Sequence, residues 1–417
     1  MSILIEKVQL NDEVRDIFIE GNLIKEINSD LQQAAEIIID GRGKAALPSF
    51  FNGHTHAAMV LLRGYADDLS LSEWLNDKIW PTEARLTEED VYWGTRLACL
   101  EMIKSGTTFF NDMYWHFHGV ARAVEDSGIR AAPSAVFIDL YDQSKAAEQI
   151  ALNRRLFEEA KHYSNRVLFT LGPHAIYTVS KESLQWAGDF AADNDVFIHL
   201  HLSETEKEVA DCIRQHGKRP VEYLHDIGFL GAQVIAAHAI WLEDREIELL
   251  EEHDVKLVYN PTSNMKLASG VFPYIKITDR DIAVVLGTDG CASNNNLDML
   301  EEMKFAALLQ KLNHNDPTVL SAHDVFQLAT TVPARIFNIN SGGIEEGKIA
   351  DLILVDLSDI HLVPNHQLIP NMVYSGNGGC VDTTICDGKI LMQNKKVEGE
   401  EEVLERAKEV AFALTSS

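Results

Sequence analysis

Histidine pairs and acidic residues follow several apolar runs of this chain, and such residue types at short spacing can bind a metal ion. The run from Ala45 to Phe51 leads into Gly53, and then into His54 and His56. Residues i and i+2 of an extended segment point to the same side, so both imidazoles can reach one point in space. The pair is also an ordinary polar end to a strand, and by itself it leaves both interpretations open.

Other candidate ligands and acid-base groups come after later apolar runs: His174, His199, His201, Glu204, His238 and Asp289. Five of the eight runs that read as strands end in His or Asp, which is more than chance polar capping would give. Imidazoles together with one carboxylate are a ligand set for zinc, and also for ferrous iron. We predict one ion, Zn²⁺ first and Fe²⁺ second, held by His54, His56, His201 and Asp289.

His199 and His201 alternate along one run and therefore face the same side of it. We predict that His201 is the ligand, because Glu204 lies just beyond it, and that His199 is a hydrogen-bonded interior residue. The run before His174 ends without a lysine. A carbamylated lysine there would be the obvious bridge between two ions, so a single ion is favoured.

The predicted ion has acid-base groups beside it. A catalytic metal keeps one position for water and lowers the pKa of that water toward neutrality. Asp289 could accept the water's proton, and Glu204 could pass a proton to a leaving or ring nitrogen. His238 could hold the hydroxide and polarise the carbon under attack. These extra groups favour an enzyme over the alternative, a binding protein with a closed structural metal site.

The elements that must position these residues alternate between strand and helix from about residue 45 onward. Apolar runs predict strands at 45–51, 107–111, 130–136, 167–171, 196–201, 233–238, 256–260 and 282–288. Helical periodicity occurs between them, as at 87–104, 181–193, 204–215 and 298–312. The first of these helices has Thr87 as its N-cap and acidic residues in its first turn. Eight strands in this alternation predict a (β/α)8 barrel over residues 49–340, and in such barrels chemistry collects at the C-terminal strand ends.

Both ends of the chain read as β structure. Gly21-Asn22 joins two short apolar runs and suits a tight hairpin. Strand patterns return at 352–355, 381–386 and 389–392, before a helix near 400–414. Each end is too small to be stable alone. We therefore predict one small β domain made from residues 1–48 and 341–417, packed on the barrel.

The amino-acid composition limits the kinds of molecule that this protein can bind. The chain has 64 acidic and 36 basic residues, a formal charge of −28, which repels nucleic acid polymers and anionic lipid. No basic leader or apolar stretch near 18 residues is present, so no membrane association is expected. Five cysteines without CxxC spacing suggest neither disulfides nor a thiolate zinc site, and favour the cytoplasm. We expect a small-molecule partner; the sequence leaves homo-oligomerisation open.

Several motifs occur in a fixed order along the chain, and together they are more specific for one protein family than any of them alone. They are Gly53–His56, Glu83 within Trp80-Pro81-Thr82-Glu83, His199–Thr205, His238, Asn260–Asn264, Gly287–Asp298 and Glu346–Asp351. This set resembles the amidohydrolase superfamily and, within it, the 5-methylthioadenosine/S-adenosylhomocysteine deaminases, over nearly the whole chain.

The resemblance implies zinc-dependent deamination of an adenine nucleoside. It implies the four metal ligands predicted above, with Glu204 passing a proton to the purine ring and His238 beside the hydroxide that attacks C6. Glu83 matches the position that holds the ribose hydroxyls, and His174 matches another substrate contact. The alternative for Glu83 is a surface carboxylate beside Ala84-Arg85.

One departure bears on the substrate. Arginines that would bind the homocysteine carboxylate are expected after the third strand, yet residues 131–153 contain no arginine, and Lys145 is their only basic residue. An arginine fork binds a carboxylate in a way that lysine does not reproduce. The nucleoside could therefore be 5-methylthioadenosine, S-adenosylhomocysteine or adenosine. Another aminated heterocycle (guanine, a triazine or a cyclic amide) is the alternative within the superfamily.

Overall fold

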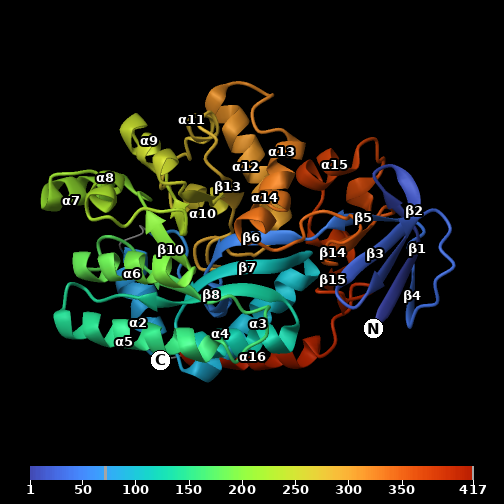
Figure 1. Cartoon of the computed structure of the whole chain (residues 1–417), viewed down its shortest axis with the longest axis horizontal. Helices are drawn as coiled ribbons and strands as arrows, with labels where there is room; N and C mark the ends of the chain where they lie inside the picture. Colours follow the sequence, from blue (N-terminus) through green and yellow to red (C-terminus); the bar gives the residue numbers. More distant parts are fainter. Residues whose placement is uncertain (70–72, 416–417) are drawn as a thin grey trace.

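The computed structural model describes residues 1–69 and 73–415, and its centre is a barrel of parallel strands. Within the described residues this sheet has eight strands, each beside its neighbour in the sequence, in the order β13-β12-β11-β10-β9-β8-β7-β6 (Figure 1). The strands are β6 (Phe50–Thr55), β7 (Thr107–Tyr114), β8 (Arg130–Phe137), β9 (Thr170–Pro173), β10 (Phe197–Leu202), β11 (Val234–His238), β12 (Lys256–Tyr259) and β13 (Val284–Leu286). The predicted (β/α)8 architecture is confirmed.

The barrel is nearly closed where β13 meets β6. The backbone N–H of Thr288 donates to Asn52 Oδ1 at 3.0 Å, and that of Asp289 donates to the carbonyl of His54 at 2.9 Å. A Cβ at Gly287 would lie 2.7 Å from the nitrogen of His54, so only glycine permits this approach. The closure therefore brings the end of the last strand against the end of the first.

Helices surround the barrel and cover its strands. They are α3 (Glu88–Lys104), α4 (Phe117–Ser127), α5 (Gln143–Ala160), α6 (Lys181–Asn194), α7 (Glu206–His216), α8 (Pro220–Asp226), α9 (Asp244–Glu252), α10 (Pro261–Lys266), α11 (Tyr274–Thr278), α12 (Met299–His314), α13 (Ala322–Leu328) and α14 (Thr331–Ile336). Short helices follow β6: η1 (Ala57–Leu62), the π-helix η2 (Trp74–Ile79) and α2 (Trp80–Glu83). Thr87 caps α3 as predicted, since its side chain accepts from the N–H of Asp90 in a capping box.

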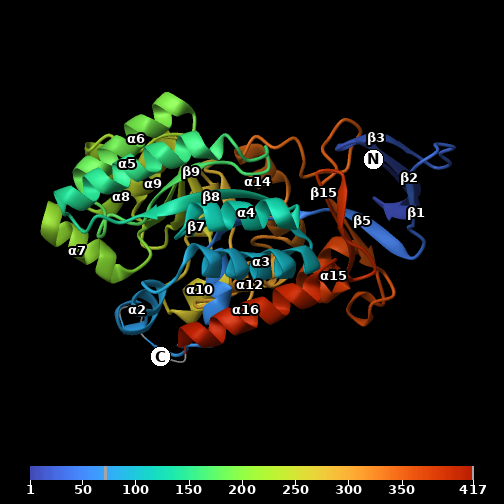
Figure 2. The same ribbon diagram turned by 90° about the horizontal axis from the view of Figure 1, so that it is seen from below.

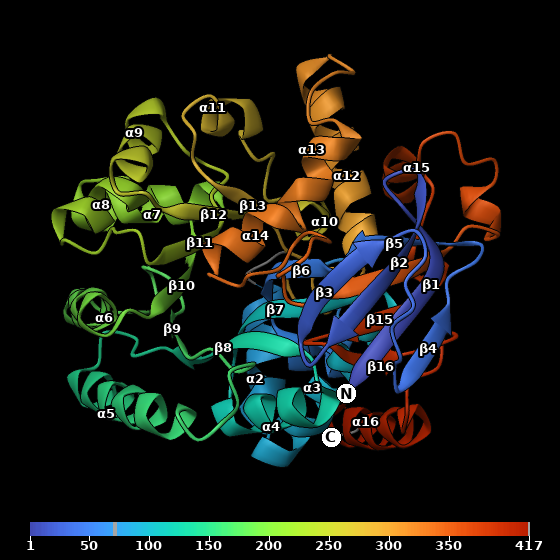
Figure 3. The same cartoon turned by 45° about the vertical axis from the view of Figure 1, so that its right-hand side comes forward.

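The second sheet combines strands from both ends of the chain, as Figure 3 shows. Its order is β16-β15-β14-β5-β1-β2-β3, with β4 paired to β1. The strands are β1 (Ser2–Leu10), β2 (Glu13–Glu20), β3 (Leu23–Asn28), β4 (Ile37–Asp40), β5 (Lys44–Pro48), β14 (Leu352–Asp356), β15 (Val381–Cys386) and β16 (Lys389–Met392). Gly21, at φ +63°, lies in the turn between β2 and β3. The predicted β domain built from both chain ends is thus confirmed as an element of the fold.

The single strand predicted at 45–51 was wrong. It is two strands in two different sheets: β5 pairs with β14 in the mixed sheet, and β6 pairs with β7 in the barrel. Ser49 alone separates them, and its backbone N–H donates to the carbonyl of Asp351. The apolar run shows no break because both strands are buried, so hydrophobicity could not reveal where the chain passes from one sheet to the other.

The C-terminal helices lie outside this second sheet. Helix α16 (Glu400–Thr415) runs along α3 of the barrel, as Figure 2 shows. It buries Val403, Ala407 and Leu414 there. The remaining short elements are η3 (Ile360–Leu362), α15 (Leu368–Tyr374) and η4 (Gly378–Cys380). Within the described residues, no helix combines the length and the apolar character needed to cross a membrane.

A buried ion cluster joins the two sheets, and its loss should destabilise the protein. Arg130, at the start of β8, lies 3.5 Å from Asp351 and 3.4 Å from Asp387, which flank strands of the mixed sheet. Removing the cation leaves two carboxylates without it in a poorly solvated place, which costs about 3–5 kcal/mol. We expect Arg130→Met to lower the free energy of unfolding by roughly that amount in urea titrations.

The matched control is Arg122→Met. Arg122 is exposed and pairs with Glu88 and Glu89 on the surface, where such pairs contribute about 0–1 kcal/mol. If the two variants unfolded at the same urea concentration, the buried cluster would have no special role in joining the sheets.

Candidate active site

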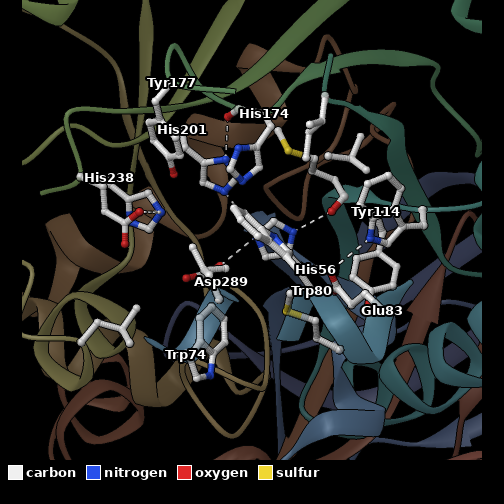
Figure 4. A pocket seen from close by; sticks show the side chains of 18 residues that line it. His56, Trp74, Trp80, Glu83, Tyr114, His174, Tyr177, His201, His238 and Asp289 are labelled. Carbon is white, nitrogen blue, oxygen red and sulfur yellow. Dashed lines mark hydrogen bonds and ion pairs between the residues drawn. The ribbon is translucent and has the colours of Figure 1, made fainter. Parts of the chain in front are cut away.

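The predicted site residues lie together at the C-terminal ends of the barrel strands. His54 is in β6 and His56 follows it, His201 is in β10, His238 ends β11, and Asp289 follows β13. Figure 4 shows His56, His201 and Asp289 side by side in one pocket. The fold therefore brings residues separated by more than two hundred positions to one place.

Three imidazole nitrogens and one carboxylate oxygen converge at the base of this pocket. The Nε2 atoms of His54 and His56 each lie 3.2 Å from Asp289 Oδ1. His201 Nε2 lies 3.3 Å from His56 Nε2, and the ligand atoms of the three histidines are all within 4.8 Å of one another. Such a set has the composition of a zinc site.

The nitrogen of His54 gives an independent test of that fit. Its Nε2 is buried and makes no hydrogen bond of suitable angle to any described residue, although Asp289 is close. A buried ring nitrogen without a hydrogen bond costs free energy unless another partner is present. A divalent cation at the centre of the four side chains would be the missing partner of this nitrogen.

Backbone carbonyls orient two of the three rings. His56 Nδ1 donates to the carbonyl of Met113 at 2.6 Å, and His201 Nδ1 donates to the carbonyl of His174 at 2.8 Å. A proton fixed on Nδ1 leaves the lone pair of Nε2 free to face an ion. Both rings are therefore set in the tautomer that a metal ligand requires.

His199 orients the third ring. Its Nε2 lies 2.7 Å from His54 Nδ1, and its own ring is outside the group of converging nitrogens. Burial lowers the pKa of both residues, to about 4 for His54, so both rings are neutral. The structure thus places His199 in a hydrogen-bonded interior position, in agreement with the sequence prediction.

Asp289 is held as an ionised carboxylate. Burial opposes its ionisation, but the imidazoles of His54 and His56, each 3.2 Å from its Oδ1, outweigh burial and keep its pKa well below the usual value. Its Oδ2 accepts from Ser263 Oγ at 2.6 Å and from Ser293 Oγ at 2.9 Å. Its backbone has φ +61°, a costly conformation that such contacts maintain.

His238 is fixed by two asparagines that sequence reasoning did not assign. Its Nδ1 accepts from Asn264 Nδ2 at 2.9 Å and from Asn260 Nδ2 at 3.3 Å. Burial lowers its pKa to about 4, so the ring is neutral and its proton is on Nε2. That Nε2–H lies 3.9 Å from Glu204 Oε2, so both groups are at the same side of the pocket. The motif 260–264 was visible in the sequence, but its target was not.

Glu204 is a buried carboxyl at the end of β10. Burial and the charge of Asp289 raise its pKa to about 8, so it holds a proton near neutral pH. The backbone N–H groups of Ser203 and Glu204 both donate to the carboxyl of Glu208, each at 2.9 Å. Glu208 therefore holds the turn that aims Glu204. The pattern Thr205-x-x-Glu208 is the sequence signal of a capping box, and it could have identified this residue.

Aromatic side chains and Glu83 form the rest of the pocket. Trp74, Trp80 and Tyr177 are in its wall. Glu83 Oε2 accepts from Trp115 Nε1 at 3.2 Å, while Glu83 Oε1 is buried without a hydrogen bond to any described residue. Burial raises the pKa of Glu83. One oxygen of this carboxyl is thus available for a ligand.

His174 also lines the pocket. Its Nδ1 lies 2.9 Å from Thr178 Oγ1, and its ring centroid is 4.8 Å from that of His201. Burial lowers the pKa of His174 to about 3, so its ring is neutral. All eight residues predicted for the site therefore lie in or around one cavity: seven line it, and His54 lies beside Asp289 at its base.

Comparison with known proteins places this fold and site. The model of the Amidohydrolase family matches residues 45–391. The chain is 49% identical to 5-methylthioadenosine/S-adenosylhomocysteine deaminase 1 of Archaeoglobus fulgidus, over 96% of this chain and 95% of that one. It is 48% identical to 5'-deoxyadenosine deaminase of Methanoregula boonei, over 99% and 95%. A zinc-bound adenosine deaminase structure from Xanthomonas campestris has a TM-score of 0.94 at 32% identity, covering 100% and 99%.

A nearly closed barrel with a metal-type ligand set at its strand ends defines a metal-dependent hydrolase. The chain belongs to the amidohydrolase family. Because the chain belongs to this family and is similar to these deaminases over nearly its whole length, it is a hydrolytic deaminase that acts on a C–N bond. The family uses a divalent metal.

Proposed function

We propose that this protein hydrolyses the 6-amino group of adenine nucleosides, so that water and the nucleoside give the inosine-type nucleoside and ammonia. The observation that supports this most is the layout of one cavity. Converging metal-type ligands and a proton-holding Glu204 are in the same pocket as the buried carboxyl of Glu83. The two curated relatives described above are named as deaminases of adenine nucleosides, which agrees with this chemistry.

One Zn²⁺ is the ion we assign to the site, with Fe²⁺ as the alternative. His54, His56, His201 and Asp289 would hold it. When bound, the ion supplies a Lewis acid that lowers the pKa of a water molecule. Two of the imidazoles already have their second nitrogen hydrogen-bonded to a carbonyl, an arrangement that orients metal-binding histidines.

Three side chains would manage the protons of the reaction. Asp289 accepts a proton from the attacking water while oxygen bonds to C6. Glu204, which is protonated near neutral pH, donates a proton to the purine ring and takes up and returns protons as the amino group leaves as ammonia. The Nε2–H of His238 donates a hydrogen bond to the oxygen that develops negative charge.

Glu83 would bind the sugar. A carboxylate accepts hydrogen bonds from two neighbouring hydroxyls. Glu83 Oε1, which lies in the surroundings of the Tyr114 side chain, makes no hydrogen bond of suitable geometry to a described residue. Trp115 holds the second oxygen in place. The aromatic wall suits a flat heterocycle between the sugar site and the metal site.

A nucleoside panel tests the proposal. Purified, zinc-loaded protein is incubated with adenosine, 5-methylthioadenosine, 5'-deoxyadenosine, guanine and a triazine, and ammonia release is measured. We expect ammonia from the adenine nucleosides, together with the ultraviolet shift from adenine to hypoxanthine. Ammonia from guanine or the triazine alone would make the protein a deaminase of another heterocycle.

Glu83→Gln should separate binding from chemistry. The amide keeps the shape but loses one acceptor for the ribose hydroxyls, so KM for nucleosides should rise roughly 10- to 100-fold with little change in kcat. The substrate 2',3'-dideoxyadenosine, which lacks both hydroxyls, is the internal control, since its KM should not change. An equal rise for both substrates would rule out ribose recognition by Glu83.

A further inference from the structure

A second cavity lies against the active-site pocket. The two cavities share four wall residues: Trp80, Glu83, Trp115 and Ile138. The rest of the second wall is Ala84, Leu86, His116, Leu140 and Thr178, and we call this space the outer chamber. Because Glu83 and Trp115 border both spaces, a ligand whose middle is bound by Glu83 can extend from the metal site into the outer chamber.

The wall of the outer chamber is apolar. None of the described residues that line it is a lysine or an arginine. Apart from Glu83, which borders both cavities, two polar side chains of the wall are already engaged: His116 Nε2 lies 3.0 Å from the carbonyl of Leu86, and Thr178 Oγ1 is 2.9 Å from His174 Nδ1. A carboxylate entering this chamber would meet no cation, and the formal charge of −28 would repel it further.

Leu140 is held in this wall by a costly backbone. Its φ is +49°, that of Tyr141 is +63°, and its side chain is an exposed apolar group, 54% accessible. Buried Asp139 maintains the turn, since it accepts from the N–H of Tyr141 at 2.8 Å and from Ser180 Oγ at 2.6 Å. Strained residues that their surroundings fix are often found at ligand sites. The turn thus presents a leucine side chain to the chamber in one defined position.

We propose that the outer chamber receives the substituent on the 5' carbon of the nucleoside, and that Leu140 is a specificity-determining residue there. The inference rests on the proposed function. It adds the substrate class: adenine nucleosides with a small uncharged 5' group, such as methylthio or hydrogen, are preferred over those with a charged amino-acid tail. Apolar contacts in the outer chamber favour the small uncharged 5' group. Among the described residues, the chamber has no cation to compensate the carboxylate of an amino-acid tail, so nucleosides with such a tail bind less well.

The test compares nucleosides that differ only at the 5' position. For the zinc-loaded protein, kcat/KM is measured with 5'-deoxyadenosine, 5-methylthioadenosine and S-adenosylhomocysteine. We expect the two apolar nucleosides to exceed S-adenosylhomocysteine by at least roughly tenfold, the scale of discrimination by one apolar contact region. Equal values for all three would overturn the role of the chamber, while leaving nucleoside deamination intact. No activity on any of them would instead overturn the proposed function.

Variants at position 140 then test the residue itself. Leu140→Arg supplies a cation, and we expect it to raise the ratio of kcat/KM for S-adenosylhomocysteine over 5-methylthioadenosine roughly tenfold. Leu140→Met keeps the apolar wall and should leave that ratio unchanged. Leu140→Ala removes apolar contacts and adds no larger side chain. It should lower kcat/KM for 5-methylthioadenosine without any gain for S-adenosylhomocysteine. If neither Arg nor Ala changed the ratio, Leu140 would not determine specificity.

Discussion

Replacing Glu204 by glutamine should lower kcat by about 10²- to 10⁴-fold, the contribution of a positioned general acid-base group. The glutamine amide has the same shape and can still accept the weak contact from Ser269, which is at 3.5 Å, but it cannot give up or take up a proton. Because Glu204 is outside the converging ligand set, the bound metal should remain at the level of the unchanged protein. The measurements are steady-state kinetics and metal content on the same preparation.

Glu206→Gln is the matched control for this prediction. Glu206 begins α7 only two residues later and is exposed, so the same chemical change there should leave kcat within about twofold. A Glu204→Gln enzyme with nearly full kcat would show that another group moves the proton. Loss of metal together with activity would show that Glu204 supports the ligands instead.

Removing the metal should abolish deamination and lower the melting temperature. Three buried side chains and the partly buried His56 would then face one another without a central cation, including the His54 nitrogen that makes no hydrogen bond to a described residue. We expect chelated protein to recover activity when one equivalent of Zn²⁺ is added, and thermal unfolding to shift upward in parallel. Fe²⁺ is the second ion to add, because imidazoles and a carboxylate also suit it.

Stoichiometry needs its own control, because Asp359, His361 and Cys380 form a second group with ligand atoms within 4.8 Å of one another. The His361→Ala variant removes a member of that group far from the catalytic pocket. One zinc per chain in both proteins, with full activity, is the expected result. Activity that survived complete removal of metal would contradict the metal-dependent mechanism.

Much of the fold followed from local patterns. The alternation of apolar runs with helical periodicity predicted the barrel, and strands at both ends predicted the mixed sheet. What local patterns could not show was the passage between the sheets at Ser49, since Pro48 and Phe50 belong to one continuous apolar run. Sheet partners of a strand depend on distant segments, here β14 and β7, which hydrophobicity does not encode.

The candidate site was predictable to the level of residue types at strand ends. The rule that barrel chemistry lies at C-terminal strand ends selected His201 and Asp289 without any coordinates. The supporting partners were not predictable in the same way. Asn264 and Ser263, in α10 after β12, each contact a residue at the end of a neighbouring strand, and such contacts depend on side-chain directions that only the folded chain sets. Glu208 is the exception, because its capping-box spacing was visible.

The single-residue link at Ser49 has a consequence for how the protein forms during synthesis. Strand β5 pairs with β14, which lies about three hundred residues later, and β14 in turn pairs with β15. The ribosome must therefore produce almost the entire chain before the sheet that anchors the start of β6 can be completed. His54 and His56 are made early but reach their final position late, so translation that stops before residue 352 should give a chain whose first histidine pair is not yet anchored.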